Sequence, residues 1–539
     1  MSDLRNTRRD LLAAASAGAL AGLVPNGLIP ATEALAQAGP RKGGVHNVIA
    51  FPEPPTLFIG LDQNGSTQTV AGKIYESLLT YDFDFTPRPS LAKSWEISPD
   101  GLVYTFHLQE NVKWHDGKPF SADDVVFSIS DFLMEMHPRA RPIFQNCSKI
   151  EALDPQTVRF TLKQVFAPFM LGFEFSTTPI IPAHLYKGTN FRSNPNNANP
   201  VGTGPFKLGE WRKGAFIKLV RNPEYYIKDQ PYLDEIYFHI LPDANARALA
   251  MEQGRVQQSQ FFDLEGYDVQ RLAEASHLQL ITKGYEFFAP VVRLEFNTRV
   301  KPFDDKRFRQ AINYALDRQL IVDNIFFGQG KVATGPFNSR TRFYDGNVKK
   351  YDYNLATAKA LLDDMGLKPD SRGVRSKVTF LRLPWGEAFA RLAEYVKQSL
   401  AQIGIEVEIE SADPAGWTSR YANWEFQITS NNPYQFGDPA LGIARFFVSS
   451  NIRKGVAYSN CTGYSSPVMD DLFARGAATI DPAERQKIYS EAQRILVEDV
   501  PMAWLFEYEL PTLVDRRLKD CVVSAIGVNE TYRQAFRTA

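Results

Sequence analysis

The chain has 539 residues, a formal net charge of −1 and a hydrophobic content of 44%. This length exceeds the roughly 250–300 residues at which a single core stops growing, which predicts more than one domain. The balanced charge argues against a nucleic-acid-binding surface, because such a surface needs an excess of basic side chains.

The N-terminus carries the pattern of an export signal. Arg8 and Arg9 precede an apolar run over 11–24, and small residues follow at 34 and 36. This order is typical of a twin-arginine signal that is cleaved after Ala36. The run is shorter than the roughly 20 residues that span a bilayer, so a membrane anchor is the weaker reading. We therefore expect a processed periplasmic protein without a membrane span.

In chain order, the first half predicts strands separated by turns. Residues 102–108 alternate apolar and polar side chains, which indicates a half-buried strand. Ser121 and Asp124 have the spacing of a capping box and predict a helix start. Residues 66–81 are expected to be helical around Val70, Ile74 and Leu78. Further strands are expected at 150–153, 158–162, 206–208, 216–220 and 237–241, and a helix at 244–251.

The second half predicts alternating strands and helices. An apolar stripe from Phe389 to Ile403 indicates a helix between strands at 378–383 and 405–410. Short joints in this order predict a right-handed βαβ unit. Gly366 is expected to end a helix at 359–365, and Asp481 to cap the next one.

Four stretches together resemble a known family. They are the run from Leu91 to Ile129 (LAKSWEISPDGLVYTFHLQENVKWHDGKPFSADDVVFSI), NPVGTGPFKL at 199–208, FNTRVKPFDDKRFRQAINYALDR at 296–318 and YDYNLATAKALLDDMGL at 351–367. With these four stretches, the chain resembles the extracytoplasmic solute-binding proteins of ABC importers, in the dipeptide, oligopeptide and nickel-binding family (family 5). This resemblance covers nearly all of the mature chain.

The resemblance implies an α/β fold, the two-lobed type II periplasmic-binding clamp with an extra subdomain in its first lobe. The implied boundaries divide the chain into a signal at 1–36, a first-lobe core, a first-lobe subdomain at 76–201 and a second lobe at 293–506. The core of the first lobe is expected to combine residues 37–75, 202–292 and 507–539. Periodicity by itself predicts only an α/β protein of more than one domain.

The expected site is a ligand-binding cleft without catalytic residues, metal ligands or cofactors. No nucleotide-binding or hydrolase motif is present. His115 beside Asp116 is best read as a structural turn, and Cys147, Cys461 and Cys521 as buried free thiols. A loop at the carboxyl end of a parallel strand is a common ligand site in open α/β sheets. The expected ligand-binding residues are Glu53, Thr56, Leu57, Trp385, Trp417, Tyr434, Gln435 and Asp438, although both tryptophans could equally be core residues.

The implied function is capture of a peptide or peptide-like solute for an ABC permease with a separate ATPase, by a monomer. A chemosensory or chaperone role on the same fold is the alternative, and an exported hydrolase a weaker one. The ligand itself stays open among a di- or oligopeptide, a modified peptide, an opine, a glycan and a metal chelate.

The loop at 431–439 departs from the peptide-binding members. Those members usually carry an Asp three residues before the acidic-Pro pair, where it binds the ligand's amino group. Counting back from Asp438 gives the neutral Gln435, and the position of a carboxylate-binding Arg in some members is Thr429. We therefore expect a ligand whose affinity does not need a free amino terminus, unless Asp438 or Glu53 supplies the anion.

Overall fold

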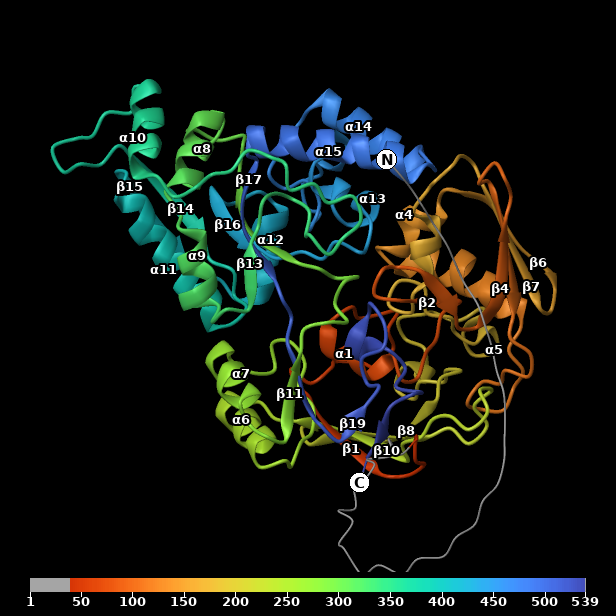
Figure 1. Cartoon of the computed structure of the whole chain (residues 1–539). Coiled ribbons are helices and arrows are strands. Elements are labelled where there is room, and N and C mark those ends of the chain that lie inside the picture. Colours follow the sequence, from red (N-terminus) through yellow and green to blue (C-terminus); the bar gives the residue numbers. More distant parts are fainter. Residues whose placement is uncertain (1–38, 539) are drawn as a thin grey trace, which may run out of the picture. The chain divides into compact units, whose positions relative to one another are not determined.

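The structure is a computed structural model that describes residues 39–538 (Figure 1). The Arg8-Arg9 pair and the expected cleavage site after Ala36 lie outside the described residues and stay predictions. None of the helices in the described part has the length and hydropathy that a membrane crossing requires.

The core of the first lobe is a four-stranded sheet in the order β1-β10-β9-β8. β1 runs parallel to β10, so the start of the chain pairs with a strand almost two hundred residues later. A second, two-stranded sheet joins β11 to β18 from the C-terminal region. The elements of this core are β1 (Val45–Ala50), α1 (Gly65–Ala71), β8 (Phe206–Arg212), β9 (Phe216–Arg221), β10 (Glu235–Ile240), α6 (Ala244–Glu252), α7 (Gly266–Ala273), β11 (Leu278–Ile281), β18 (Thr512–Asp515), β19 (Leu518–Lys519) and β20 (Phe536–Arg537).

The segment between α1 and β8 forms its own antiparallel sheet in the order β4-β5-β7-β6. Along β5 the even-numbered side chains are buried and the others half-buried, which confirms the predicted alternation. Ser121 and Asp124 form the predicted capping box at the start of α2. The elements are β2 (Leu79–Tyr81), β3 (Pro87–Pro89), β4 (Ala92–Ile97), β5 (Val103–Leu108), α2 (Ala122–Phe127), a π-helix (Ser128–Leu133), α3 (Met134–Met136), α4 (Ala140–Phe144), β6 (Cys147–Asp154), β7 (Thr157–Leu162) and α5 (Ala183–Tyr186).

The predicted helix over 66–81 is wrong beyond its first half, because α1 ends at Ala71 and β2 begins at Leu79. The carbonyl of Ile74 accepts the backbone N–H of Gly204, and that of Lys73 accepts the N–H of Phe206. A distant segment thus takes the carbonyls that a continuing helix would use. The apolar spacing reflects burial in this packed turn rather than a helical period.

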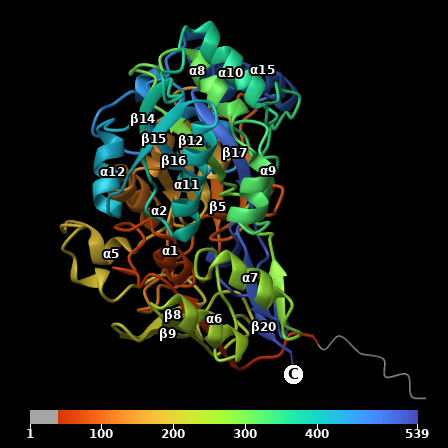
Figure 2. The same cartoon turned by 90° about the vertical axis from the view of Figure 1, so that its left-hand side faces the viewer.

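The second lobe contains a six-stranded mixed sheet in the order β13-β17-β12-β16-β14-β15. β14 and β15 are parallel and flank α11, as the βαβ prediction requires, and Figure 2 shows this sheet above the first-lobe helices α6 and α7. Gly366 has a φ of +77° just after α10, the left-handed position expected for a helix end. Its elements are β12 (Val291–Phe296), α8 (Lys306–Tyr314), α9 (Arg318–Leu320), β13 (Gly330–Val332), α10 (Leu355–Asp364), β14 (Ser376–Leu381), α11 (Glu387–Ala401), β15 (Ile405–Glu410), α12 (Pro414–Ala422), β16 (Ile428–Asn431), α13 (Pro439–Gly442), α14 (Pro467–Ala478), α15 (Pro482–Asp499) and β17 (Met502–Tyr508).

The chain passes twice between the two-stranded sheet of the first lobe and the six-stranded sheet of the second. β11 leads into β12, and β17 leads into β18, so each passage joins a strand of one sheet to a strand of the other. β12 and β17 are neighbours in the second-lobe sheet. Because these neighbouring strands carry both passages, the links between the lobes lie side by side, as in a hinge.

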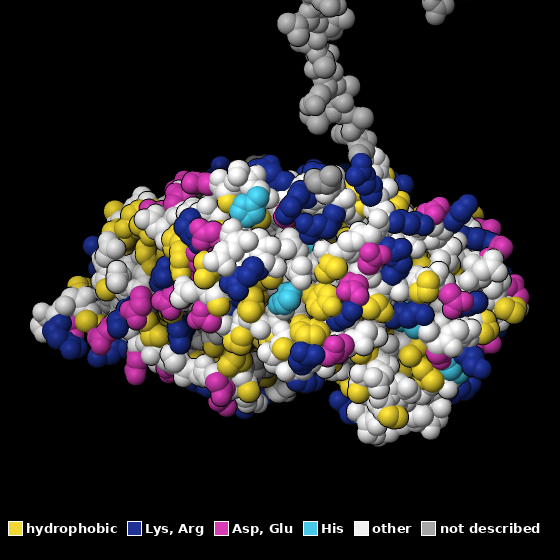
Figure 3. Space-filling model, turned by 90° about the horizontal axis from the view of Figure 1, so that it is seen from below, with side chains coloured by type: hydrophobic (Ala, Val, Ile, Leu, Met, Phe, Trp, Pro, Cys, Tyr) yellow, Lys and Arg dark blue, Asp and Glu magenta, His cyan; other side chains and the backbone are white. Residues whose placement is uncertain are grey.

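Charged side chains are mixed over the face seen in Figure 3, where basic and acidic groups alternate without a continuous area of one sign. This distribution agrees with the net charge of −1. It gives no support to a basic surface for nucleic acid on that face.

Candidate functional site

The candidate site is centred on the carboxyl end of β16, which runs parallel to β14 before the loop at 432–438. Ser430 and Asn431 end this strand and are buried, with exposed fractions of 0% and 3%. The hydroxyl of Ser430 and the Nδ2 of Asn431 have no hydrogen-bond partner within residues 39–538. Unpartnered buried polar atoms are uncommon, which directs attention to what else could bind them.

Three arginines and two phenylalanines alternate beside this strand end, and we call this set the arginine–aromatic array. The guanidinium carbons of Arg139 and Arg445 lie 4.9 and 5.4 Å from the ring centre of Phe436. Those of Arg445 and Arg293 lie 4.6 and 4.1 Å from the ring centre of Phe446. Arg139 belongs to the connection between α3 and α4 in the first lobe. The array therefore draws on both lobes.

Only one arginine of the array has a carboxylate partner within the described chain. Arg293 Nη2 donates to Glu295 Oε1 at 2.7 Å, and both side chains are buried. Arg139 donates to the backbone oxygen of Ser176, and Arg445 to that of Gly442. Burial, followed by the nearby charges of Arg293 and Arg139, lowers the pKa of Arg445 to about 10. The array is thus a region of excess positive charge.

The two predicted tryptophans differ in their surroundings. Trp417 is fully buried, stacks on Tyr421 with ring centres 4.8 Å apart and donates from Nε1 to the hydroxyl of Thr429. Trp385 is 39% exposed and meets Trp417 edge to face at 5.2 Å. Tyr421 also donates to Glu295 at 2.7 Å. Trp417 is therefore a packing residue behind the array, while Trp385 offers an open aromatic surface.

Tyr434 and Gln435 occupy the loop after β16. Tyr434 is half-buried beside Phe288, its hydroxyl has no hydrogen-bond partner in the described part, and burial raises its pKa to about 12. Gln435 is 4% exposed; its Oε1 accepts the N–H of Asn338 and its Nε2 donates to the carbonyl of Pro336, each at 3.0 Å. Tyr434 is therefore free to contact a ligand, whereas the amide of Gln435 is already used within the protein.

Asp438 is 1% exposed, and its Oδ1 accepts from Arg485 Nη2 and from the N–H of Ala440, both at 2.9 Å. It caps α13 and pairs with a buried arginine, so its charge serves the loop itself. Burial raises the pKa of this carboxyl, and the ion pair with Arg485 opposes that change. Its Oδ1 is thus engaged at the end of the loop, while its Oδ2 has no hydrogen-bond partner within residues 39–538, and a ligand contact of Asp438 stays a prediction.

Glu53, Thr56 and Leu57 make contacts within the first lobe. Glu53 Oε1 accepts from Trp211 Nε1 at 3.0 Å, and the hydroxyl of Thr56 accepts the N–H of Phe58 at 3.1 Å. Leu57 has no exposed surface. None of these interactions reaches the arginine–aromatic array, so a ligand-binding role for the three stays a prediction from the family resemblance.

Comparison with known proteins identifies the family. Residues 86–454 match the family model described as bacterial extracellular solute-binding proteins, family 5 middle, and this is more than half of the chain. The chain belongs to this family. It is 29% identical to the oligopeptide-binding protein AppA of Bacillus subtilis over 87% of each chain. The periplasmic binding protein DppA of Helicobacter pylori, solved with the peptide STSA, is 27% identical, with a TM-score of 0.78 over 93% of this chain and 99% of that one. AgaA, solved with agropinic acid, is 27% identical, with a TM-score of 0.76 over 92% and 99%.

In this solute-binding protein, prediction from sequence missed the arginine–aromatic array. Arg139 and Arg445 look like ordinary surface residues when read by periodicity, because a single charged residue gives no sign of its burial. Arg445 does stand inside the apolar run LGIARFFV at 441–448, and a charge within such a run was the one available signal. Arg139, in MHPRARP, offered none.

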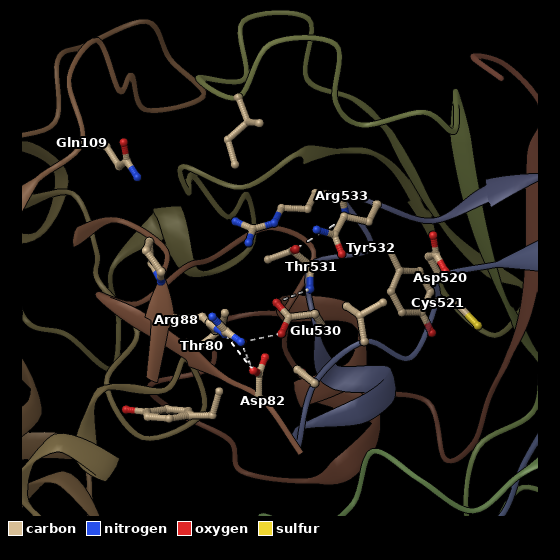
Figure 4. A pocket seen from close by; sticks show the side chains of 16 residues that line it. Thr80, Asp82, Arg88, Gln109, Asp520, Cys521, Glu530, Thr531, Tyr532 and Arg533 are labelled. Atoms are coloured by element: carbon tan, nitrogen blue, oxygen red, sulfur yellow. Dashed lines mark hydrogen bonds and ion pairs between the residues drawn. The ribbon is translucent and has the colours of Figure 1, made fainter. Parts of the chain in front are cut away.

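A cavity of about 460 Å³ lies elsewhere in the solute-binding protein, lined by residues of the first lobe (Figure 4). Its charged groups are largely satisfied within the protein, since Arg88 pairs with Asp82 and Thr80 donates to Glu530. The lining comes from 80–89, 109, 227 and 520–534, and includes nothing from the second lobe. This cavity is therefore separate from the array, which combines both lobes.

Proposed function

We propose that this solute-binding protein is the periplasmic receptor of an ABC importer and captures a peptide or peptide-like solute between its lobes. Family membership and the names of its relatives support the class of ligand. A separate permease and ATPase take the solute from the receptor. The protein performs no covalent chemistry and acts as a monomer that reaches the periplasm through the twin-arginine route.

The observation that carries this proposal is the approach of Arg139 and Arg445 to one ring, that of Phe436, from opposite lobes. A solute that contacts both lobes binds the closed arrangement more tightly than an open one, so its binding shifts the protein toward closure. A shift from 1:99 to 99:1 requires about 5.5 kcal/mol of differential affinity. Strands β12 and β17, which carry the two passages between lobes, provide the hinge.

The contacts of the nearby acidic groups support a ligand that needs no free amino terminus. By the ungapped count, Gln435 takes the position at which peptide-binding members usually have an Asp, and its Oε1 and Nε2 both bind groups of the protein. Asp438 binds Arg485, and Glu53 binds Trp211 and Gly214. An ammonium group buried without a carboxylate is costly. A peptide with a blocked or modified amino terminus avoids this cost.

Spin labels on opposite lobes test the receptor function. Lys187 and Lys454 are exposed, one in the first-lobe subdomain and one in the second lobe. With both replaced by Cys and labelled, in a Cys147→Ser background, a peptide with affinity established by calorimetry is expected to shorten the distance between labels. An unchanged distance at saturation contradicts a clamp. As a control, the same peptide is added to protein that carries both labels in one lobe, and the distance between those labels should not change.

The alternative roles on this fold are separated by a deletion strain. Loss of uptake of the identified solute, with chemotaxis and the refolding of exported proteins intact, is the outcome expected of an importer subunit. Loss of chemotaxis toward the solute with intact uptake would indicate a chemosensory receptor instead. An exported hydrolase has no support from the family, whose members are described as binding proteins.

A further inference from the structure

Arg340 binds both of the chain segments that connect the lobes. These two links are residues 282–290, between β11 and β12, and residues 509–511, between β17 and β18. Arg340 Nη1 donates to the backbone oxygen of Thr282 at 2.8 Å, and Nη2 donates to Glu509 Oε1 at 2.7 Å. We call these two bonds the Arg340 bracket, because one side chain of the second lobe fastens the two links together.

The segment around Arg340 is anchored in the second lobe, and we call it the hinge strap. It comprises residues 336–342, between β13 and α10. Phe337 of this strap is fully buried and packs against Tyr489 of α15, with ring centres 5.9 Å apart. Arg340 therefore moves with the second lobe, whereas Thr282, the first residue after β11, moves with the first lobe. The hydrogen bond between them crosses the hinge.

The lobes touch each other in this structure, so the Arg340 bracket is formed in the closed arrangement. The N–H of Ala167 in the first-lobe subdomain donates to the carbonyl of Ala477 at the end of α14, at 2.8 Å. Arg342 of the hinge strap donates to the carbonyl of Asp84 in the first lobe at 3.2 Å. Lobe rotation takes place in the backbone angles of link residues, so it disturbs bonds that a second-lobe side chain makes to the links.

The hinge strap also holds the loop of the candidate site. The side chain of Gln435 accepts the N–H of Asn338 and donates to the carbonyl of Pro336, each at 3.0 Å. On the other side of the strap, the hydroxyl of Ser339 donates to Glu507 Oε2 on β17 at 2.6 Å. The loop after β16, the hinge strap and β17 therefore form one hydrogen-bonded unit.

The Arg340 bracket is suited to shift a conformational equilibrium rather than to lock it. The side chains of Arg340 and Glu509 are 28% and 32% exposed, so solvent weakens their ion pair. The bond to the carbonyl of Thr282 is charge-assisted, which makes it stronger than a neutral hydrogen bond. A half-exposed bracket of this kind changes the ratio of closed to open protein by about 3- to 10-fold.

We propose that Arg340 is a positioning residue that stabilises the closed lobe angle of the empty protein, and that Gln435 connects it to the binding loop through the hinge strap. This inference rests on the proposed receptor function and concerns its regulation. The bracket raises affinity because it raises the fraction of protein that is competent to bind. It therefore strengthens the binding of every solute by the same factor and leaves the preference among solutes unchanged.

Distances between the lobes in the empty protein test the bracket. Spin labels at positions 187 and 454, in the Cys147→Ser background, report the ratio of closed to open protein. Arg340→Gln is expected to lower this ratio about 3- to 10-fold, and Arg340→Lys, which keeps a charge beside Glu509, to restore part of it. Glu509→Gln leaves the bond to the backbone in place and should give a smaller loss. An unchanged ratio in Arg340→Gln overturns the proposal.

Arg221 provides the matched control, because it combines the same two kinds of partner within one lobe. Its side chain is 27% exposed, pairs with Asp234 and donates to the backbone oxygen of Tyr232 at 2.9 Å. Arg221→Gln should leave the distance ratio unchanged. A shift as large as that of Arg340→Gln would mean that the loss of any such arginine disturbs the lobes, which overturns the specific role of the hinge.

Affinity is a second readout, and a merely structural arginine would not produce its pattern. The probes are those members of a library of free and N-acetylated di- to pentapeptides that bind wild type in calorimetry. Arg340→Gln is expected to weaken all of them by one common factor of at most about 10. A changed ranking of the peptides would make Arg340 a ligand contact and overturns the bracket. A library without any binder contradicts the peptide receptor, while the distances in the empty protein still decide the bracket.

A double variant tests the connection to the binding loop. If the loop, the hinge strap and the bracket act as one unit, Gln435→Ala and Arg340→Gln each lower the ratio of closed to open protein. The double variant then lowers it no further than the stronger single change does. Additive effects, or an unchanged ratio in Gln435→Ala, overturn the role of Gln435.

Discussion

Arg485 Nη2 lies 2.9 Å from Asp438 Oδ1, and both side chains are buried, one on α15 and the other at the end of the loop after β16. The pair ties the candidate site to the longest helix of the second lobe. It engages Oδ1 of the acidic residue of this loop, whose Oδ2 has no hydrogen-bond partner in the described part.

Removing one partner of this pair is expected to destabilise the protein strongly. Asp438→Ala leaves Arg485 buried without a carboxylate, which costs about 3–5 kcal/mol in comparable cases. Urea unfolding of the ligand-free protein measures the change. The double variant Asp438→Ala/Arg485→Met is expected to recover much of the loss, since no charge then stays unpaired. A loss below about 1 kcal/mol in the single variant would show that the pair is dispensable.

The two tryptophans are expected to separate stability from binding. Trp417→Ala removes a fully buried side chain, so we expect a loss of about 3–5 kcal/mol in unfolding free energy. Trp385→Ala removes a partly exposed ring and should cost little stability while weakening ligand binding. In both variants, calorimetry measures ligand binding and urea unfolding measures stability. Equal stability losses in the two variants would contradict this division.

The amino terminus of the ligand is the subject of a third prediction. Because Gln435 is neutral and its amide is used by Asn338 and Pro336, N-acetylation of a bound peptide should leave its affinity nearly unchanged. Calorimetry with free and acetylated forms measures the difference. If acetylation costs at least about 2 kcal/mol, the scale of a broken buried charge pair, another acid binds the amino group. Gln435→Asp tests the same position and should increase the preference for the free amine.

A pH dependence follows from Glu76, which is 1% exposed and accepts hydrogen bonds from Tyr225, Tyr226 and Thr203. Burial raises the pKa of this carboxyl from 4.5 to about 7. The folded protein therefore holds this proton to higher pH than the unfolded chain does. The stability that the raised pKa of Glu76 contributes is complete below pH 4.5. It falls as the pH rises toward 7 and is lost above that value.

The variant Glu76→Gln isolates this effect, because the buried histidines contribute equally to both proteins. We expect the stability of wild type relative to Glu76→Gln to fall by up to about 3 kcal/mol between pH 4.5 and 7.5, from a shift of this size at 1.36 kcal/mol per pKa unit. Urea unfolding across this range provides the measurement. A relative stability that stays flat would mean that Glu76 ionises normally in the fold.

Export is tested on the precursor. Arg8→Lys/Arg9→Lys is expected to retain the protein in the cytoplasm, since a receptor reads the arginine pair as an address. Fractionation followed by immunoblotting measures the distribution. Normal periplasmic levels of this variant would show that another route exports the protein.

Side-chain periodicity predicted an element correctly where the pattern lies within the element itself. The alternation in β5 and the βαβ unit around α11 follow from side-chain spacing and short turns. The helix over 66–81 failed because its end depends on Gly204 and Phe206, far along the chain. Recognition of the family supplied the two-lobed fold, which no local pattern contains.

The candidate site was harder to predict from the sequence, because it combines residues that are far apart in the chain. Tyr434 and Trp385 stood in plausible loops and do offer surface near the strand end. Arg139 and Arg445 are half-buried and form no ion pair within residues 39–538, and both properties arise only when distant segments meet. Asp438 shows the opposite case, because an acid in the expected loop turns out to be bound by Arg485.

The pairing of the chain's two ends has a consequence for biosynthesis. Thr69 in α1 donates to Asn529, and β11 finds its partner in β18 at residues 512–515. The first lobe is therefore incomplete on the ribosome until residues 512–529 have been translated, whereas every strand of the second-lobe sheet has been made once residue 508 has emerged. A transport route that accepts folded cargo would have to wait until these residues have joined the first lobe, so export would begin only after they have been translated.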